Sequence, residues 1–290
     1  MPSIETLIED IQRLVEDDSH VVSDEAKERL GKDIAATIVS NLFNDRAKQA
    51  AKGALRMSSL GTSCDRELWL KDRHPEAREA LPYNARLKYL FGHILEELLL
   101  FLAEESGHKV EKRQQILNLN GVAGQRDCVI DGVQIDVKSA STRGFEKFKK
   151  HELETNDPFG YIVQNNAYWY ADKELTDERV GFLAIDKQFG HVCLDLYPVD
   201  KSRDYSELVD QKRSVLASDA APRRGYIPEP DGKSGNLKLC TKCSYCDVKG
   251  KCWPDLRAFL YSSGPRYLTH VAKLPDVREV TSVGDDEESS

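Results

Sequence analysis

The feature that most constrains the fold is a run of alternating apolar and polar residues around an Asp-Gly pair. Val133, Ile135 and Val137 alternate with polar residues directly after Asp131-Gly132, within the stretch GVAGQRDCVIDGVQIDVKSAS (residues 121–141). Asp-Gly is favoured in two-residue hairpin turns because both positions tolerate a positive φ. The pattern therefore predicts two antiparallel strands joined by a tight turn.

Charged residues of this hairpin are expected to gather on one face. Asp136 and Lys138 lie two residues apart and so share a face, and the turn brings Asp127 beside Asp136. Two adjacent carboxylates repel each other and favour a divalent cation such as Mg²⁺ or Mn²⁺. Ile135 and Val137 would then face the core, while Lys138 orients a water or stabilises charge on a phosphate. The alternative interpretation is a solvated hairpin edge with incidental charges.

The rest of the chain predicts an α+β fold, with a central mixed sheet flanked by helices. Apolar periodicity predicts helices at residues 4–17, 24–50, 84–106, 143–151, 158–172 and 201–217. Strands are expected at 109–119 and in a second hairpin formed by VGFLAID and HVCLDLYPV. A short helix should follow Thr62 or Ser63, either of which would be its N-cap, and another should follow the C-terminal cysteines.

Composition sets weaker limits. The chain has 290 residues, enough for one large domain with additions, and its net charge of −8 is unusual for a nucleic-acid binder. An enzyme needs only a local positive groove, however, and carboxylates that hold cations are themselves acidic. No run of about 18 apolar residues predicts a membrane span, and the start MPSIETLIEDIQ does not resemble a signal peptide, so we expect a cytoplasmic protein.

Two helices carry pairs of polar residues at helical spacing. His93 and Glu97 are four residues apart and share a face, and Glu96 is three residues from His93. An imidazole can bind a divalent metal, although an exposed polar helix face is the simpler interpretation. Gln164 and Tyr168 have the same spacing and could contact a phosphate, sugar or base, or simply pack.

Basic residues offer candidate contacts for a phosphate backbone. The segment RGFEKFKK mixes them with Phe145 and Phe148, which would suit a single strand or a frayed end, whereas the alternative is an ordinary basic helix face. The candidate contacts are Arg66, Arg143, Lys147, Lys149 and Lys150.

Cysteines cluster near the C-terminus. Cys243, Cys246 and Cys252 form a Cys-x2-Cys-x5-Cys run, and Cys240 lies three residues earlier. Thiolates this close indicate a metal site with four ligands, either Zn²⁺ or a [4Fe–4S] cluster. The fourth ligand is Cys240 in a local zinc site, or else the distant Cys64. The two others, Cys128 and Cys193, lie in apolar strand patterns and are expected in the core.

These pieces occur in an order typical of one family. The chain resembles RecB-type nucleases of the PD-(D/E)XK superfamily, and especially their iron–sulfur members: CRISPR-associated adaptation nucleases, AddB-type nuclease domains and phage exonucleases. The resemblance covers about residues 61–253 and rests on SCDRELWL, FGHILEELL, GQRDCVIDGVQIDVKSAS, QNNAY and CSYCDVKGKC. It implies a restriction-endonuclease-like core over residues 56–265, with an N-terminal helical region (1–55) and a partly disordered C-terminal tail (266–290).

The resemblance also implies residue roles. It makes His93, Asp127, Asp136 and the carbonyl of Val137 the ligands of Mg²⁺ or Mn²⁺. Lys138 becomes the catalytic lysine, and Gln164 and Tyr168 become the substrate-binding motif. Glu97 becomes the first acidic residue of the family pattern, and its neighbour Glu96 is the alternative for that position. The cluster ligands would be Cys64, Cys243, Cys246 and Cys252, and the cluster would join the N- and C-terminal parts of the nuclease domain. Cys240 is one cysteine more than the family pattern has, so a zinc site that uses it stays an alternative.

The expected activity is hydrolysis of DNA phosphodiesters by metal-activated water, as an exonuclease on single-stranded or frayed ends. No Gly-rich Lys-Ser/Thr phosphate loop is present, so a helicase fusion is not indicated. The expected partners are DNA and recombination or replication proteins, and the expected location is the cytoplasm of a bacterium or a phage-infected host. The alternatives are a structure-specific endonuclease and a non-catalytic DNA-binding protein with a metal-stapled fold.

Overall fold

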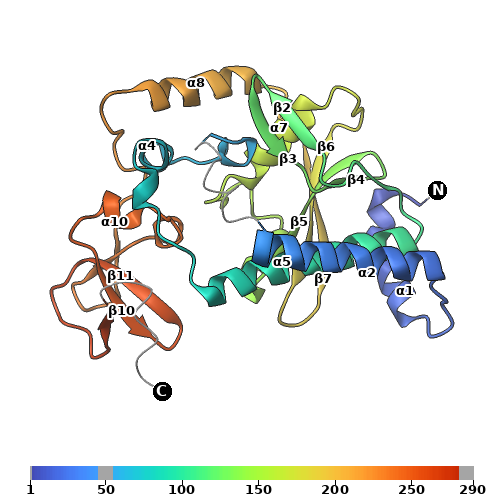
Figure 1. Cartoon of the computed structure of the whole chain (residues 1–290), viewed down its shortest axis with the longest axis horizontal. Coiled ribbons are helices and arrows are strands. Elements are labelled where there is room, and N and C mark those ends of the chain that lie inside the picture. The colour runs from blue at the N-terminus through green and yellow to red at the C-terminus, as the bar shows by residue number, and fades with distance from the viewer. Residues whose placement is uncertain (1, 45–54, 281–290) are drawn as a thin grey trace. The chain divides into compact units, whose positions relative to one another are not determined.

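The computed structural model describes residues 2–44 and 55–280 (Figure 1). The chain divides into two compact units. The first comprises residues 1–61 and 84–210, and the second comprises residues 62–83 and 211–290. The expected domain boundaries at residues 55 and 265 do not match this division, because two separate parts of the sequence contribute to each unit. In the described part of the chain, no helix combines the length and apolar character needed to cross a bilayer.

The first unit is built on a five-stranded mixed sheet with the order β1-β4-β5-β6-β7. The strands are β1 (Val110–Glu111), β4 (Cys128–Ile130), β5 (Val133–Ala140), β6 (Arg179–Asp186) and β7 (Val192–Pro198). Only β5 and β6 are parallel; the other neighbours are antiparallel. The expected Asp131-Gly132 turn joins β4 to β5, with φ angles of 49° and 87°. The hairpin prediction is confirmed, and so is the α+β class with a mixed central sheet.

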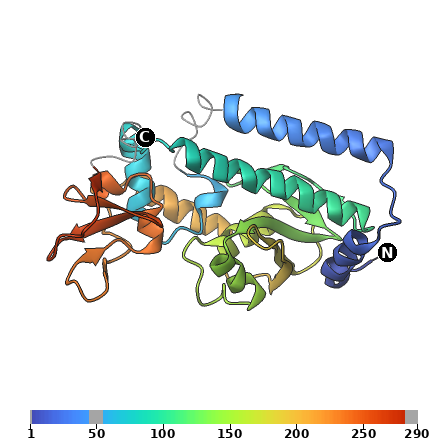
Figure 2. The ribbon, with the colours of Figure 1, turned by 90° about the horizontal axis from the view of Figure 1, so that it is seen from below.

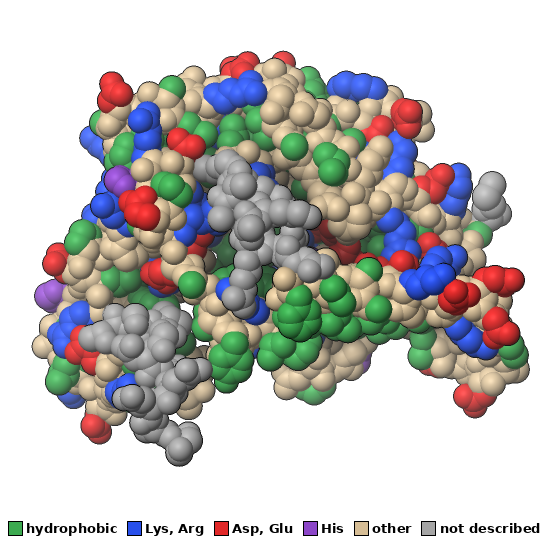
Figure 3. Space-filling view, viewed as in Figure 1, with side chains coloured by type: hydrophobic (Ala, Val, Ile, Leu, Met, Phe, Trp, Pro, Cys, Tyr) green, Lys and Arg blue, Asp and Glu red, His purple; other side chains and the backbone are tan. Residues whose placement is uncertain are grey.

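Helices cover both faces of this sheet. On one face, α1 (Leu7–Glu16) and α5 (Tyr83–Glu105) pack against apolar side chains of β4, β5 and β6. On the other face, α6 (Thr142–Lys149) and α7 (Tyr161–Ala171) pack against β6 and β7. Figure 2 shows α2 (Asp24–Val39) running beside α5, and the ion pair between Arg29 and Glu104 joins the two helices. Figure 3 shows hydrophobic side chains gathered over this region, where Val39 and Leu98 are exposed.

Most helix predictions are confirmed to within a few residues. The helix expected at 24–50 continues from α2 into a π-helical turn (Ser40–Asn44), and residues 45–50 lie outside the described part. The strand expected at 109–119 is broken instead into β1 and β2 (Ile116–Leu119), because Lys112 and Gln114 both adopt φ of 52°. A separate two-stranded sheet pairs β2 with β3 (Val122–Gln125).

The second unit holds an antiparallel sheet with the order β12-β10-β11-β9-β8. Its strands are β8 (Glu229–Pro230), β9 (Leu237–Lys238), β10 (Arg257–Tyr261), β11 (Gly264–His270) and β12 (Glu279–Val280). The unit also contains α4 (Asp65–Arg73), α9 (Thr241–Ser244), α10 (Lys249–Cys252) and most of α8 (Tyr205–Ala217). Residues 266–270 and 279–280, expected in the tail, therefore lie in strands of this sheet, and residues 281–290 lie outside the described part.

Candidate active site and cysteine site

A break in the first strand of the hairpin creates the position of Asp127. Residues 122–130, expected as one strand, divide into β3 and β4 at Arg126 and Asp127. Arg126 turns inward and forms a buried ion pair with Asp172 at 2.6 Å. Because β4 pairs only with Val133, Gln134 and Ile135, β5 continues past the end of its neighbour. Asp127 lies in this gap, where its Oδ2 accepts a hydrogen bond from the Val137 amide at 2.7 Å.

The two faces of β5 separate apolar from charged side chains as expected. Ile135 and Val137 belong to the core beneath α5. Asp136 and Lys138 point to the opposite face and form an ion pair. Asp136 is almost fully buried, and its Oδ2 accepts no hydrogen bond of normal geometry from the described residues besides this ion pair. The side chain of Lys138 is 22% exposed, so the pair opens to solvent on the lysine side.

Helix α7 closes the site from the sheet face on which Asp136 lies. Gln164 Nε2 donates a hydrogen bond to Asp136 Oδ1 at 3.2 Å. Tyr168 follows one turn later and is buried, and burial together with the charges of Asp136 and Asp127 raises its pKa. The ammonium of Lys138 lies 4.7 Å from the ring centre of Tyr161, a contact that the sequence pattern did not suggest.

Helix α5 supplies Glu96, and this corrects the expectation for Glu97. Glu96 is buried and close enough to Asp127 and Asp136 to raise the pKa of both. Glu97 instead forms an ion pair with Arg113 and accepts a hydrogen bond from Thr37 on α2. Adjacent helical residues point about 100° apart, so only one of the two glutamates can face the sheet.

His93 lies at the solvent side of the same site. Its Nδ1 is 3.7 Å from Glu96 Oε2, and its side chain is 48% exposed. The sequence-predicted residues His93, Asp127, Asp136, Lys138, Gln164 and Tyr168 are therefore brought together at the edge of β5 that β4 leaves open.

The electrostatics of the site leave excess negative charge. Burial, followed by the charges of Asp136 and Glu96, raises the pKa of Asp127 well above its usual value. Burial also raises the pKa of Asp136, against the opposing effect of Lys138. Burial alone would lower the pKa of Lys138, but the Asp136 and Asp127 carboxylates outweigh it and raise that pKa. Three carboxylates facing one ammonium carry a charge that one divalent cation would offset.

The donor set fits a hard cation. Carboxylate oxygens of Asp127 and Asp136 are available, and the Val137 carbonyl is a third candidate. In an extended strand the N–H and C=O of one residue point to the same side, so the Val137 carbonyl points to the side of Asp127, where β4 has ended. Oxygen ligands of this kind suit Mg²⁺ or Mn²⁺.

The expected DNA contacts are less well supported. Phe145 and Phe148 are buried in the core under β6, so they cannot stack on bases, and this expectation is wrong. Lys147 donates a hydrogen bond to Asn156 Oδ1 at 3.0 Å, and Lys150 forms an ion pair with Glu146. Three more candidates remain: Arg143 and Lys149 are exposed, whereas Arg66 lies in the second unit and donates to the Pro222 carbonyl at 2.8 Å.

The cysteines form a second site, within the second unit. Cys64, Cys243, Cys246 and Cys252 line one cavity together with Tyr226 and Trp253. Cys240 does not line this cavity. Burial raises the pKa of Cys243, and the charge of Cys240 is the next largest cause of that rise. Cys64 is itself the N-cap of α4, in place of the expected Thr62 or Ser63. Cys128 is fully buried and Cys193 partly buried against the sheet core of the first unit, as expected.

The spacing of the sulfur atoms bears on which metal they could hold. Four thiolates around one Zn²⁺ lie about 3.8 Å apart, because each Zn–S bond is about 2.3 Å long in a tetrahedral site. Among the described residues, no three cysteine sulfurs lie within 4.8 Å of one another. A [4Fe–4S] cube separates its thiolates more widely, because each binds a different iron. Cys240 and Cys243 lie close enough for their side chains to form a hydrogen bond, so the cavity that four of the cysteines share is the stronger observation.

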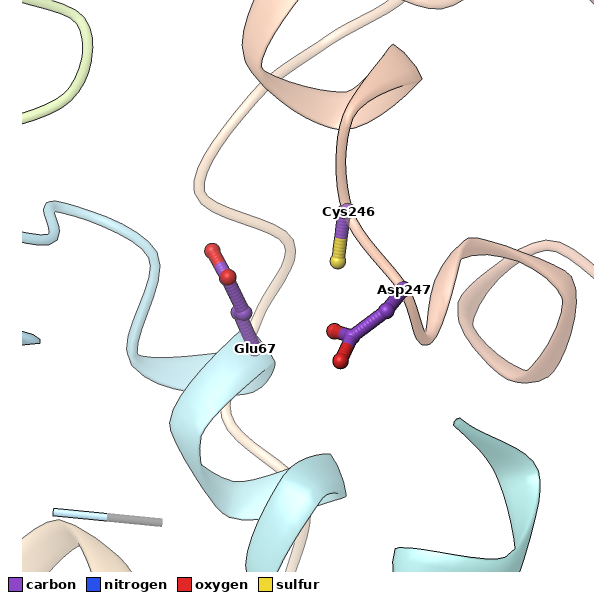
Figure 4. A group of neighbouring side chains, drawn as sticks. All are labelled: Glu67, Cys246 and Asp247. Atoms are coloured by element: carbon purple, nitrogen blue, oxygen red, sulfur yellow. The ribbon is translucent and has the colours of Figure 1, made fainter. Parts of the chain in front are cut away.

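One group of potential ligand atoms does lie within 4.8 Å: Glu67, Cys246 and Asp247 (Figure 4). Three cations neutralise its two carboxylates. Lys71 lies 2.7 Å from Glu67 and 3.0 Å from Asp247, Arg78 lies 2.9 Å from Asp247, and Lys242 lies 3.3 Å from Glu67. Burial would lower the pKa of Lys71, but these two carboxylates raise it. We therefore interpret the group as an ion-pair network that fixes α4 against the cysteine segment.

Comparisons with known proteins give little to set beside this geometry. No family model matches the chain, and no curated protein matches it. A solved structure of a protein named SSO0001 is similar over 76% of this chain and 92% of its own, with 13% identity and a TM-score of 0.39. The fold class rests on the chain's own elements, which make it an α+β protein with a mixed central sheet.

Proposed function

We propose that this protein is a Mg²⁺- or Mn²⁺-dependent DNA nuclease of the PD-(D/E)XK superfamily, RecB type. The observation that carries the proposal is the convergence of Asp127, Asp136 and Lys138 at the open edge of β5. A solvated hairpin edge would not bury Asp136 almost completely with the half-buried Asp127 beside it. Such burial is costly unless a cation or a substrate group compensates it, and the site includes an opening toward solvent at Lys138.

Each residue has a role in this mechanism. Asp127, Asp136 and the Val137 carbonyl would hold the metal ion, with His93 at the solvent side. Gln164 fixes the orientation of the Asp136 carboxylate through its hydrogen bond. Lys138 keeps its proton at neutral pH and places positive charge where a phosphate would enter. When bound, the metal ion would polarise the phosphate and lower the pKa of a water molecule.

The proposed substrate is a DNA end, single-stranded or frayed. The experiment is cleavage of a labelled linear single strand with Mn²⁺, comparing wild type with Lys138→Ala and with the exposed, ion-paired control Lys201→Ala. We expect Lys138→Ala to lose at least about 10²-fold in rate, and the control to match wild type. Equal rates for Lys138→Ala and wild type would refute the site. Cleavage of circular as well as linear strands would replace the exonuclease with an endonuclease.

We also propose that Cys64, Cys243, Cys246 and Cys252 hold a [4Fe–4S] cluster. The shared cavity, which Cys240 does not line, supports this set over a zinc site that includes Cys240. Anaerobically purified protein should be brown and contain about four irons per chain. Colourless protein with one zinc per chain would establish the alternative.

A further inference from the structure

The segment from Arg56 to Gly61 packs against α7, the helix that contributes Gln164 and Tyr168 to the candidate active site. Met57 and Leu60 are fully buried in a core shared with α7 and with β2 and β3. Gly124 on β3 makes room for Met57: a Cβ at this glycine would lie 2.4 Å from Met57 Cβ and 2.8 Å from Tyr168 Cε1. Met57 is therefore held beside the Tyr168 ring.

The other end of the segment meets the start of the same helix. A Cβ on Gly61 would lie 2.1 Å from the carbonyl oxygen of Gly160, which precedes α7. Gly160, Gln164 and Tyr168 are spaced four residues apart and share one face of α7. The segment thus contacts both ends of the face that carries Gln164 and Tyr168.

Arg56 is the exposed cation of this segment. Its backbone is held on both sides by Ser59: the Arg56 amide donates to Ser59 Oγ at 2.9 Å, and Ser59 Oγ donates to the Arg56 carbonyl at 2.7 Å. Its side chain is exposed, and its charge acts on Tyr168, the residue next to the site carboxylates.

The neighbouring cations are already committed to carboxylates: Lys138 to Asp136 and Arg126 to Asp172. Arg56 differs, because it forms no ion pair with any carboxylate in residues 2–44 and 55–280. A guanidinium that is fixed at its backbone, exposed, and without a carboxylate partner among the described residues is suited to a phosphate, which it can bind through two parallel hydrogen bonds.

Building on the proposed nuclease function, we propose that Arg56 binds a phosphodiester of the DNA strand flanking the one that is cleaved. The site itself repels a polyanion, since its carboxylates outnumber its ammonium group. A cation outside the metal position offsets this repulsion and holds the strand in register. Arg56 is a substrate-binding residue that contributes equally to the bound ground state and the transition state.

The test measures binding separately from cleavage. Fluorescence anisotropy with a labelled single strand, in Ca²⁺ over a range of salt concentrations, compares wild type with Arg56→Gln, Arg56→Lys and the exposed control Arg13→Gln on α1. We expect Arg56→Gln to weaken binding about tenfold and to reduce the slope of log K against log salt by about 0.7. Arg56→Lys should keep the slope and lose part of the affinity, and the control should match wild type.

Cleavage kinetics and a modified strand locate the contact. With Mn²⁺, Arg56→Gln should raise KM about tenfold and change kcat less than threefold, the pattern of lost uniform binding. One neutral methylphosphonate next to the cleaved bond should weaken wild type by the same factor and leave Arg56→Gln unaffected. Wild-type affinity and salt slope in Arg56→Gln would overturn the inference.

Failure of the proposed function gives a different result. If wild type binds DNA without cleaving it, the nuclease proposal fails, and the salt slope still decides whether Arg56 contacts phosphate. If wild type cleaves DNA and Arg56→Gln shows an unchanged salt slope, the Arg56 inference fails alone.

Discussion

Replacing Gly124 by alanine tests the packing between Met57 and Tyr168. The new Cβ would lie 2.4 Å from Met57 Cβ and 2.8 Å from Tyr168 Cε1, whereas ordinary contacts are 3.4–4 Å. The atoms must therefore separate by up to about 1 Å. Neither neighbour can yield easily, because Met57 Cβ is attached directly to the backbone and the Tyr168 ring is buried. Overpacking of this kind costs about 1–3 kcal/mol.

Thermal and urea unfolding, with DNA cleavage, provide the assay. Each kcal/mol lost should lower Tm by about 2–4 °C. The rate should fall further than stability alone explains, because Tyr168 and the segment carrying Arg56 are displaced together. Gly31→Ala is the matched control: it lies within α2, nothing lies within 4 Å of its added Cβ, and alanine should stabilise the helix by up to about 1 kcal/mol. A Gly124→Ala protein as stable and active as wild type would show that this packing is wrong.

Three further outcomes follow from the two sites. Mn²⁺ at ten times its Kd should stabilise wild type by about 1.4 kcal/mol in thermal unfolding, and Asp136→Asn should lose this gain; equal stabilisation of both would remove Asp136 from the metal site. Cys252→Ser should abolish the visible absorbance of anaerobically purified protein while Cys240→Ser keeps it, and the reverse result would exchange their roles. Lys71→Met should destabilise the second unit by about 2 kcal/mol, because it removes the ammonium that Glu67 and Asp247 share while Lys242 and Arg78 still pair with them; urea unfolding with unchanged stability would argue against the network.

Local patterns predicted the hairpin and most helices correctly. The Asp131-Gly132 turn and the alternation of Ile135 and Val137 with charged residues depend on the strand period of two, which holds wherever one face of a strand is buried. The break of the first strand at Asp127 was not predicted. It depends on the burial of Arg126 against Asp172, 46 residues away, and no local pattern records such a partner.

Other assignments needed the rotation of each helix about its axis. Glu96 and Glu97 are equivalent in the sequence, and only the packing of α5 turns Glu96 toward the carboxylates and Glu97 toward Arg113. The same holds for Phe145 and Phe148, whose helix faces the core and not a strand of DNA. Arg56 had no signal at all, since its position comes from contacts of the segment with α7.

The sequence by itself determined the residue types, the secondary-structure periods and the spacing of the cysteines, because these depend on neighbours a few positions away. Tertiary structure decided which of the two adjacent glutamates meets the aspartates, whether Cys64 or Cys240 shares the cavity with the three C-terminal cysteines, and where Arg56 lies. Those outcomes depend on how elements distant in the chain pack together. Consecutive residues of a helix point about 100° apart, so a shift of one position moves a charge from the site to a surface ion pair.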